Sequence, residues 1–273
     1  MIHRRKRIQI EKSEGVPKDF SAEAYHFLNP DIEPGGYPGK EGAIQHWMLH
    51  GKAESREYKY AYQNKKQSRI SVVMPSYLGE YSTEFTSSAK DREAKFERSI
   101  NSFLTQTHKN SELIIVSDGC QKTGEILRKK FSHWIENRII YIEIEKQPLF
   151  SGTVRNSGLR IVKGDIVCYL DTDDMFGPKH LEIISKGFDH SSDWCFFNDY
   201  VYDGNLKLIR NSEIEYSKIG TSNFAHKRFT NVKWKDGYGH DFETILTILN
   251  LKHRKIQTPE YFVCHQTSIG LDF

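Results

Sequence analysis

The sequence lacks most of the features that mark secreted, disulfide-linked or membrane-spanning proteins. Its four cysteines are far apart and share no CxxC spacing, so we expect reduced thiols in a cytoplasmic protein rather than disulfides or a zinc site. No apolar run approaches the roughly 20 residues that cross a bilayer. The basic start MIHRRKRIQI is followed by neither an apolar segment nor a small-residue cleavage site, so we predict no signal peptide.

Charge of either sign is not in marked excess. Lysine and arginine together number 39 against 36 acidic residues, which gives a net charge of +3. A dedicated nucleic-acid binder usually carries a concentrated basic face, so we expect no nucleic-acid partner. The 273 residues suffice for one large domain, or for one domain with a small appendage.

Three short zones precede the main domain. Residues 1–19 are polar and mixed in charge and are predicted to be a lead-in. Residues 20–58 are predicted to form a small helical module, because two helical stretches flank the Pro- and Gly-rich segment NPDIEPGGYPG. Residues 59–69, KYAYQNKKQSR, are polar and predict a linker. Since roughly 40 residues make a marginal core, we expect the module to pack on the main domain or on a partner.

Residues 70–273 alternate apolar, strand-like runs with amphipathic helical runs. This alternation is typical of βαβ units, and it predicts an α/β domain with a Rossmann-like, mostly parallel sheet flanked by helices. After residue 190 the pattern loosens into short strands and loops, with one clear helix over 241–250 and a strand-like YFVCHQ. The earlier predicted strands cover 69–77, 111–119, 138–145 and 165–170, and the earlier predicted helices cover 91–107, 123–137 and 153–164.

Three carboxylates, Asp171, Asp173 and Asp174, follow the predicted strand over 165–170. In an open α/β sheet the ligand lies beyond the carboxyl ends of the strands, and Asp118 follows a neighbouring strand. Side chains alternate along an extended chain, so Asp171 and Asp173 should point the same way. Two converging carboxylates suit a hard cation such as Mg²⁺ or Mn²⁺. The alternative is a turn in which aspartates cap backbone amides.

Four segments in order give the chain, from about Ile70 to Ile269, a resemblance to a family 2 glycosyltransferase of the GT-A fold. They are SVVMPSY, RSINSFLTQTHKNSELIIVSDGC, GTVRNSGLRIVKGDIVCYLDTDD and GHDFE. The resemblance implies a metal-assisted, inverting transfer of a sugar from a nucleotide-sugar donor, with a UDP-hexose favoured, to an acceptor hydroxyl, for instance on a glycan. It also implies Mn²⁺ or Mg²⁺ as the cofactor.

The resemblance assigns nucleotide contacts to the ends of the first strands and to one helix. Pro75, Ser76 and Tyr77 would cradle the base, and the ring of Tyr77 could stack on it. Asp118 would accept hydrogen bonds from the uracil or the ribose. Arg155 would place its fixed charge near the donor phosphates, although a surface position on a helix is an equal alternative.

Within the acidic triplet, the resemblance makes Asp173 the direct metal ligand and gives Asp171 the ribose or a water-mediated contact. Asp174 is expected to cap the turn. His265, after the last predicted strand, is a second candidate metal ligand, and its alternative is a structural histidine.

Asp241 is expected to be the general base that deprotonates the acceptor hydroxyl. The alternative is an acid favoured for its position at the start of a helix. The family usually carries a Glu-Asp pair here, whereas this chain has His240 before Asp241. This departure leaves the role of the neighbouring position open.

Rival functions are weighed by the same motifs. Haloacid-dehalogenase-type phosphatases carry a DxD after their first strand, typically followed by Gly-Thr, whereas here three predicted strands precede it and Met175-Phe176 follow. Sugar nucleotidyltransferases need a Gly-rich basic loop after strand one, and MPSYLGEYSTEF has none. No GxGxxG supports a dehydrogenase. A non-catalytic nucleotide-sugar or glycan-binding module remains open.

The segment 20–58 is similar to a short module in some bacterial polysaccharide-related and surface proteins. The shared pattern is F-x-x-x-x-Y-x-x-x-N-P-D followed by H-x-x-x-x-G-x-x-E-x-R. No chemistry follows from this pattern, and a purely structural role is favoured over docking or acceptor positioning.

Overall fold

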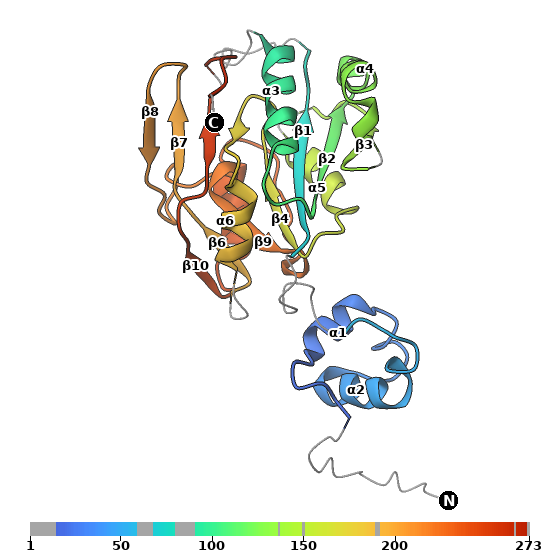
Figure 1. The fold of residues 1–273 in the computed structure, drawn as a ribbon. Coiled ribbons are helices and arrows are strands. Elements are labelled where there is room, and N and C mark those ends of the chain that lie inside the picture. The colour runs from blue at the N-terminus through green and yellow to red at the C-terminus, as the bar shows by residue number, and fades with distance from the viewer. Residues whose placement is uncertain are drawn as a thin grey trace, which may run out of the picture. The chain divides into compact units, whose positions relative to one another are not determined.

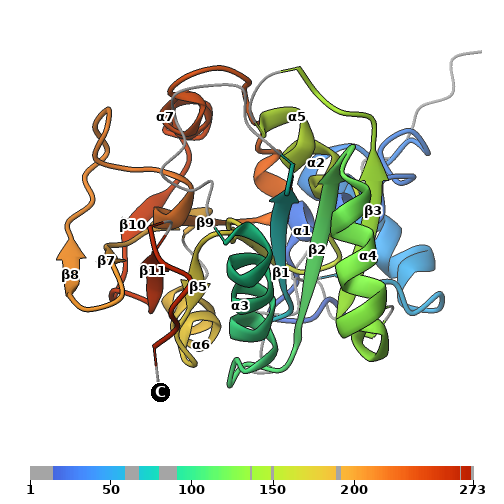
Figure 2. The same cartoon turned by 90° about the horizontal axis from the view of Figure 1, so that it is seen from above.

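A computed structural model describes residues 15–58, 68–79, 91–135, 137–148, 151–188, 192–264 and 266–271. The chain divides into two units, Met1–Lys66 and Gln67–Phe273. The described part of the first unit holds two short helices and a π-helical turn, and that of the second holds the other described helices and all the described strands. Figure 1 shows these elements and labels most of them, and Figure 2 labels β5, β11 and α7.

The N-terminal unit is a small aromatic core between two helices. Helix α1 (Ala22–Leu28) begins where the Ser21 hydroxyl accepts a hydrogen bond from the Ala24 amide at 3.1 Å. Helix α2 (Gly39–His46) continues into the π-helical turn η1 (Trp47–Gly51). Buried side chains of these elements and of the segment between α1 and α2 form one cluster: Tyr25, Ile32, Ala43 and Trp47.

Internal contacts account for most of the sequence pattern noted in this unit. The hydroxyl of Tyr25 lies 2.9 Å from Nδ1 of His46. A Cβ on Gly51 would lie 1.8 Å from that same hydroxyl oxygen, so only glycine fits there. The Asn29 amide donates to the carbonyl of Tyr25 at 2.8 Å, and Arg56 pairs with two carboxylates of the pattern, Asp31 and Glu54.

The second unit is built on a seven-stranded sheet with the order β10-β6-β9-β4-β1-β2-β3. Strand β1 pairs in parallel with β2 and β4, and β2 pairs in parallel with β3. Strand β9 runs antiparallel to both β4 and β6. The bounds are β1 (Ile70–Ser76), β2 (Ser111–Asp118), β3 (Ile139–Ile144), β4 (Ile166–Tyr169), β6 (Trp194–Phe196), β9 (Phe224–Lys227) and β10 (His253–Lys255).

Helices cover both faces of this sheet, which is why its central strands are almost continuously apolar. Successive residues of β1 point to opposite faces of the sheet, so Val72 packs into one core and Val73 into the other. Figure 2 shows α3, α4 and α6 on one face and α5 and α7 on the opposite face. The bounds are α3 (Arg92–Leu104), α4 (Gln121–Lys130), α5 (Gly152–Leu159), α6 (His180–Gly187) and α7 (His240–Leu246).

A second sheet, which the sequence pattern did not predict, lies in the C-terminal half with the order β5-β11-β7-β8. Its strands are too short for a periodic signal, because the described ones have two to four residues. The predicted strand at YFVCHQ corresponds to β11. The bounds are β5 (Met175–Phe176), β7 (Asp199–Tyr202), β8 (Lys207–Arg210) and β11 (Tyr261–Val263).

The predicted α/β fold with a mostly parallel sheet is confirmed, and apart from the second sheet the differences lie at element ends. The single helix predicted over 123–137 is wrong in length. Helix α4 ends before Phe131, whose φ is −126°, and a 3₁₀ turn, Ser132–Trp134, follows. The chain must turn there because β3 begins at Ile139.

Helix α5 packs closely on the sheet at Gly158. A Cβ at this position would stand 2.7 Å from Val73 Cγ1 and 3.1 Å from Val116 Cγ2. We expect Gly158→Ala to lower the free energy of unfolding by about 1–2 kcal/mol, because overpacking costs about 1–3 kcal/mol and the better helix propensity of alanine returns up to about 1 kcal/mol. Urea denaturation measures the difference.

The control for this substitution is Ser157→Ala, one position earlier in the same helix. The Ser157 hydroxyl donates only to the carbonyl of Thr153 within α5, at 3.0 Å, so its removal should change stability by no more than about 0.5 kcal/mol. A Gly158→Ala protein as stable as the wild type would contradict the close packing of α5.

Candidate functional site

The carboxylates predicted from the sequence come together around one cavity. A cavity of about 420 Å³ is lined by Asp171, Asp173, Asp174 and Asp241. This volume lies within the range of about 300–1,000 Å³ that is common for small-molecule sites. The rest of the lining is Arg210, the segment 217–223 and Val263. The acids after β4 therefore share a cavity with an acid from the first turn of α7, some 70 residues further along the chain.

Helix α3 holds the backbone of the acidic turn. The Ser99 hydroxyl lies within hydrogen-bond distance of three carbonyl oxygens of the turn, those of Asp171 at 3.2 Å, Thr172 at 3.0 Å and Asp174. The guanidinium of Arg98 donates to the carbonyl of Asp173. These contacts engage the backbone oxygens of the turn from the side of α3.

The sequence suggested that Asp174 caps its own turn, but its carboxylate instead bridges the turn to β11. Its carboxylate accepts hydrogen bonds from the Tyr261 hydroxyl and from the Cys264 amide, each at 2.9 Å. Burial raises the pKa of Asp174 well above its usual value, and the charges of Asp173 and Asp171 act in the same direction. Asp174 is thus a buried tie between the acidic turn and the second sheet.

Asp171 is held by a buried arginine. Nη2 of Arg155 lies 2.6 Å from Oδ1 of Asp171, and the guanidinium stacks 4.5 Å from the ring centre of Trp234. Burial opposes the charge of Arg155, but Asp171 and Asp241 outweigh it and the pKa of the guanidinium is raised. The alternative of a surface arginine is wrong, since Arg155 is 3% exposed. Its predicted contact with donor phosphates stays a prediction.

Asp241 stands in the first turn of α7 at the cavity. The helix follows Gly239, whose φ of +78° is a conformation that favours glycine. Oδ2 of Asp241 accepts from the Thr221 amide at 3.4 Å, and Oδ1 lies 2.8 Å from Nε2 of His240. Burial would raise the pKa of Asp241, but His240 and Arg155 outweigh it and the pKa is lowered. Asp241 is therefore an ionised carboxylate facing a cavity.

A second group of predicted residues lies at the ends of β1 and β2. The carboxylate of Asp118 accepts from the Gln147 amide at 2.6 Å and from Lys146 Nζ at 2.7 Å. The same ammonium lies 4.6 Å from the centre of the Tyr77 ring. The sequence reasoning missed Lys146, although a basic residue two positions after the strand that ends at Ile144 was a usable signal.

The remaining two predicted base contacts differ from each other. The Ser76 hydroxyl is buried and lies 2.9 Å from the Thr123 hydroxyl of α4, so it joins the strand to a helix. Pro75 is half-buried in β1, beside Val116 of β2 in the parallel pairing. His265 lies outside the described residues, and its predicted role as a metal ligand stays a prediction.

The donor set of the cavity fits a hard divalent cation in part. Among the described residues, no group of three or more His, Cys, Asp or Glu side chains could hold a metal ion. Mg²⁺, however, is commonly bound by one or two carboxylates together with substrate phosphates, and Asp171 and Asp173 offer such oxygens. Asp173 also acts on the buried ammonium of Lys95 in α3. Burial lowers the pKa of Lys95, and the charge of Asp173 acts against that shift.

Two cationic side chains of the cavity were not predicted. Arg210 of β8 makes a two-point contact with the buried carboxylate of Asp199, with Nε at 2.9 Å from Oδ1. Lys218 pairs with Glu213 at 2.8 Å and with Glu215 at 2.7 Å. Both lie in the region after residue 190, where the sequence pattern did not predict how the short strands and loops are arranged.

The fold of the second unit is that of GT-A glycosyltransferases. The structure of residues 1–349 of TarS from S. aureus superposes with a TM-score of 0.55 at 15% identity, over 72% of this chain and 60% of that chain. The mannosyltransferase PcManGT from Pyrobaculum calidifontis, solved with GDP-Man and Mn²⁺, superposes with a TM-score of 0.53 at 12% identity, over 89% of this chain and 68% of that chain.

Residues 86–244 match the family model for glycosyl transferase family 2, and the chain belongs to that family. Among its relatives is the glycosyltransferase GlyA from Streptococcus pneumoniae, 29% identical over 136 residues, which cover 50% of this chain but 17% of the relative. The resemblance stated from the four sequence motifs is thereby confirmed. In the described part of the chain, none of the helices has the length and apolar character needed to traverse a lipid bilayer.

Two substitutions at Asp174 separate its hydrogen bonds from its charge. We expect Asp174→Ala to lower the free energy of unfolding by about 1–3 kcal/mol, because the buried Cys264 amide loses its acceptor. Asp174→Asn should lose clearly less stability than Asp174→Ala, since its amide oxygen can still accept from the Cys264 amide and only the Tyr261 hydroxyl loses its acceptor. Urea denaturation at neutral pH with a chelator present measures both. Equal losses in the two variants would contradict the bridging role.

Proposed function

We propose that the chain is an inverting, metal-assisted glycosyltransferase that moves a sugar, with a UDP-hexose favoured as donor, to an acceptor hydroxyl. The observation that carries the proposal is the single cavity shared by Asp171, Asp173 and Asp241. A site for sugar transfer needs both a place for the donor diphosphate and a base for the acceptor. The carboxylates that line this cavity are candidates both for holding the donor diphosphate through a cation and for acting as the base.

The donor half of the proposed site is the edge formed by β1, β2 and the acidic turn. Asp173 would hold Mn²⁺ or Mg²⁺, and Asp171 would contact the ribose or a water while Arg155 keeps its carboxylate in place. When bound, the cation would neutralise charge on the leaving nucleoside diphosphate. Asp118 and Tyr77 would receive the nucleotide base. The structures of TarS in complex with UDP-GlcNAc and of PcManGT in complex with GDP-Man support a nucleotide sugar but differ in the nucleotide.

The acceptor half of the proposed site is Asp241. Its lowered pKa keeps the carboxylate ionised near neutral pH, which is the form that can take a proton. As the acceptor oxygen bonds to the anomeric carbon, the hydroxyl proton passes to Asp241. The bond from that carbon to the diphosphate oxygen breaks, and its electron pair leaves with the nucleoside diphosphate. Attack opposite the leaving group inverts the anomeric centre.

Calorimetry with UDP tests the donor half. We expect UDP binding to require Mn²⁺ and to be lost in Asp173→Ala. Asp203→Asn is the matched control, because this exposed aspartate only accepts from two amides of the turn between β7 and β8, a role that asparagine can also take. Metal-independent UDP binding, or no UDP binding at all by the wild type, would contradict the donor assignment.

Hydrolysis and transfer assays with UDP-, GDP- and dTDP-sugars test the acceptor half. We expect Asp241→Asn to keep UDP binding while turnover falls by about 10²–10⁴-fold, the usual contribution of a general base. If the wild type binds UDP but turns over no donor, the non-catalytic binding module replaces the enzyme. Cleavage of phosphate monoesters would instead favour the phosphatase.

A further inference from the structure

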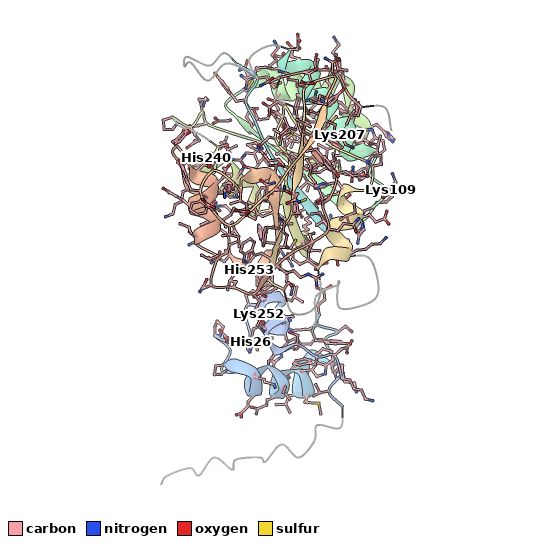
Figure 3. The ribbon with its side chains drawn as sticks, turned by 90° about the vertical axis from the view of Figure 1, so that its left-hand side faces the viewer. His26, Lys109, Lys207, His240, Lys252 and His253 are labelled. Carbon is pink, nitrogen blue, oxygen red and sulfur yellow. The ribbon has the colours of Figure 1, made fainter. Side chains whose placement is uncertain are left out.

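His240 occupies the position next to the proposed base, where the family usually has a glutamate, and its imidazole has two competing neighbours. Nε2 lies 3.2 Å from Nη1 of Arg155 and 2.8 Å from Oδ1 of Asp241. Nδ1 lies 2.9 Å from the carbonyl oxygen of Gly237. Figure 3 labels this side chain on the helix α7.

The hydrogen-bonding chemistry of the ring makes these two neighbours exclusive. A carbonyl oxygen can only accept, so Nδ1 carries a hydrogen and donates it to Gly237. In the neutral ring Nε2 then has a lone pair, which can accept from Arg155 but repels the carboxylate of Asp241. In the cationic ring Nε2 carries a hydrogen, which attracts Asp241 and repels Arg155. One proton therefore decides which of the two residues the imidazole contacts.

The surroundings of His240 keep this choice local. Among the described residues, the charged groups that act on its pKa include Arg155 from α5 and Asp241 from its own helix. Asp236, on the loop before α7, is engaged by the amide and hydroxyl of Thr153 at 2.9 and 2.5 Å. The uncharged ring of Trp234 lies 5.8 Å from the imidazole, centre to centre. Burial opposes the charge of the ring, but Asp241 outweighs it and the pKa of His240 is raised.

We propose that His240 is a positioning residue whose proton holds Asp241, and that its neutral form turns to Arg155 and releases Asp241 to act as the base. The inference rests on the proposed function, because it takes Asp241 as the group that deprotonates the acceptor. With the imidazole neutral, Oδ1 of Asp241 loses its cationic neighbour and becomes the better proton acceptor. A glutamate at this position could not act in this way, since it offers no cation to the aspartate.

The first test is the pH profile of kcat/KM with whichever nucleotide sugar the wild type turns over. The neutral fraction of an ordinary histidine, with a pKa of about 6.5, rises about fourfold from pH 6 to pH 8. Since the pKa of His240 is raised, we expect activity to rise by at least this factor. In His240→Gln, which is neutral at both pH values, this rise should disappear. His253→Gln, on the exposed strand β10, should keep the wild-type rise. A His240→Gln profile that still rises like the wild type would overturn the proposal.

The second test needs no turnover. Imidazole NMR of the metal-free protein, with the His240 signal assigned through His240→Gln, gives the midpoint of its titration. We expect Asp241→Asn to move that midpoint to lower pH, because the carboxylate that stabilises the cation is gone while Arg155 remains. An unchanged midpoint would overturn the proposal whatever the activity. If the midpoint moves but the wild type transfers no sugar, the proposed function fails and the coupling of His240 to Asp241 stands.

Discussion

Like charges crowd the end of β4, where three carboxylates fall within four residues, and much of the second unit is arranged to hold them. The charge of each carboxylate is accommodated in a different way. Asp171 is neutralised by the buried guanidinium of Arg155, and Asp174 is buried on Tyr261 and Cys264 with a raised pKa. Asp173 remains at the cavity, where a cation can interact with it. The turn thus draws α5, β11 and α3 toward one point of the sheet edge.

The alternation of apolar strands and amphipathic helices was enough to predict the α/β fold, because buried parallel strands leave long apolar runs in the sequence. It was also enough to expect Asp118 and Asp171 at one edge, since parallel strands end on the same side. The end of α4 and the second sheet could not be predicted in this way. The helix ends where the chain must turn toward β3, and the described strands of the second sheet are too short to show a period.

Within the candidate site, the sequence order of the motifs suggested that Asp171, Asp173 and Asp241 belong together, and they do line one cavity. The groups that hold them were not predictable from local patterns. The partners of Asp174 lie about 90 residues further along the chain, and Arg155 reaches His240 across 85 positions. Such contacts depend on how whole elements pack. The spacing of residues within one helix or strand therefore cannot predict them.

The core of the N-terminal unit bears on what its recurring sequence pattern can mean. Tyr25, Asn29, His46 and Gly51 are engaged with one another or with nearby backbone. Among residues 15–58, the large apolar side chains that are exposed, Phe27, Met48 and Leu49, fall at none of the positions of the pattern. The pattern therefore encodes the interior and the ion pairs of Arg56 with the exposed Asp31 and Glu54, and it leaves the exposed apolar positions unspecified. Two chains that share it can be expected to share an interior while presenting different apolar surfaces.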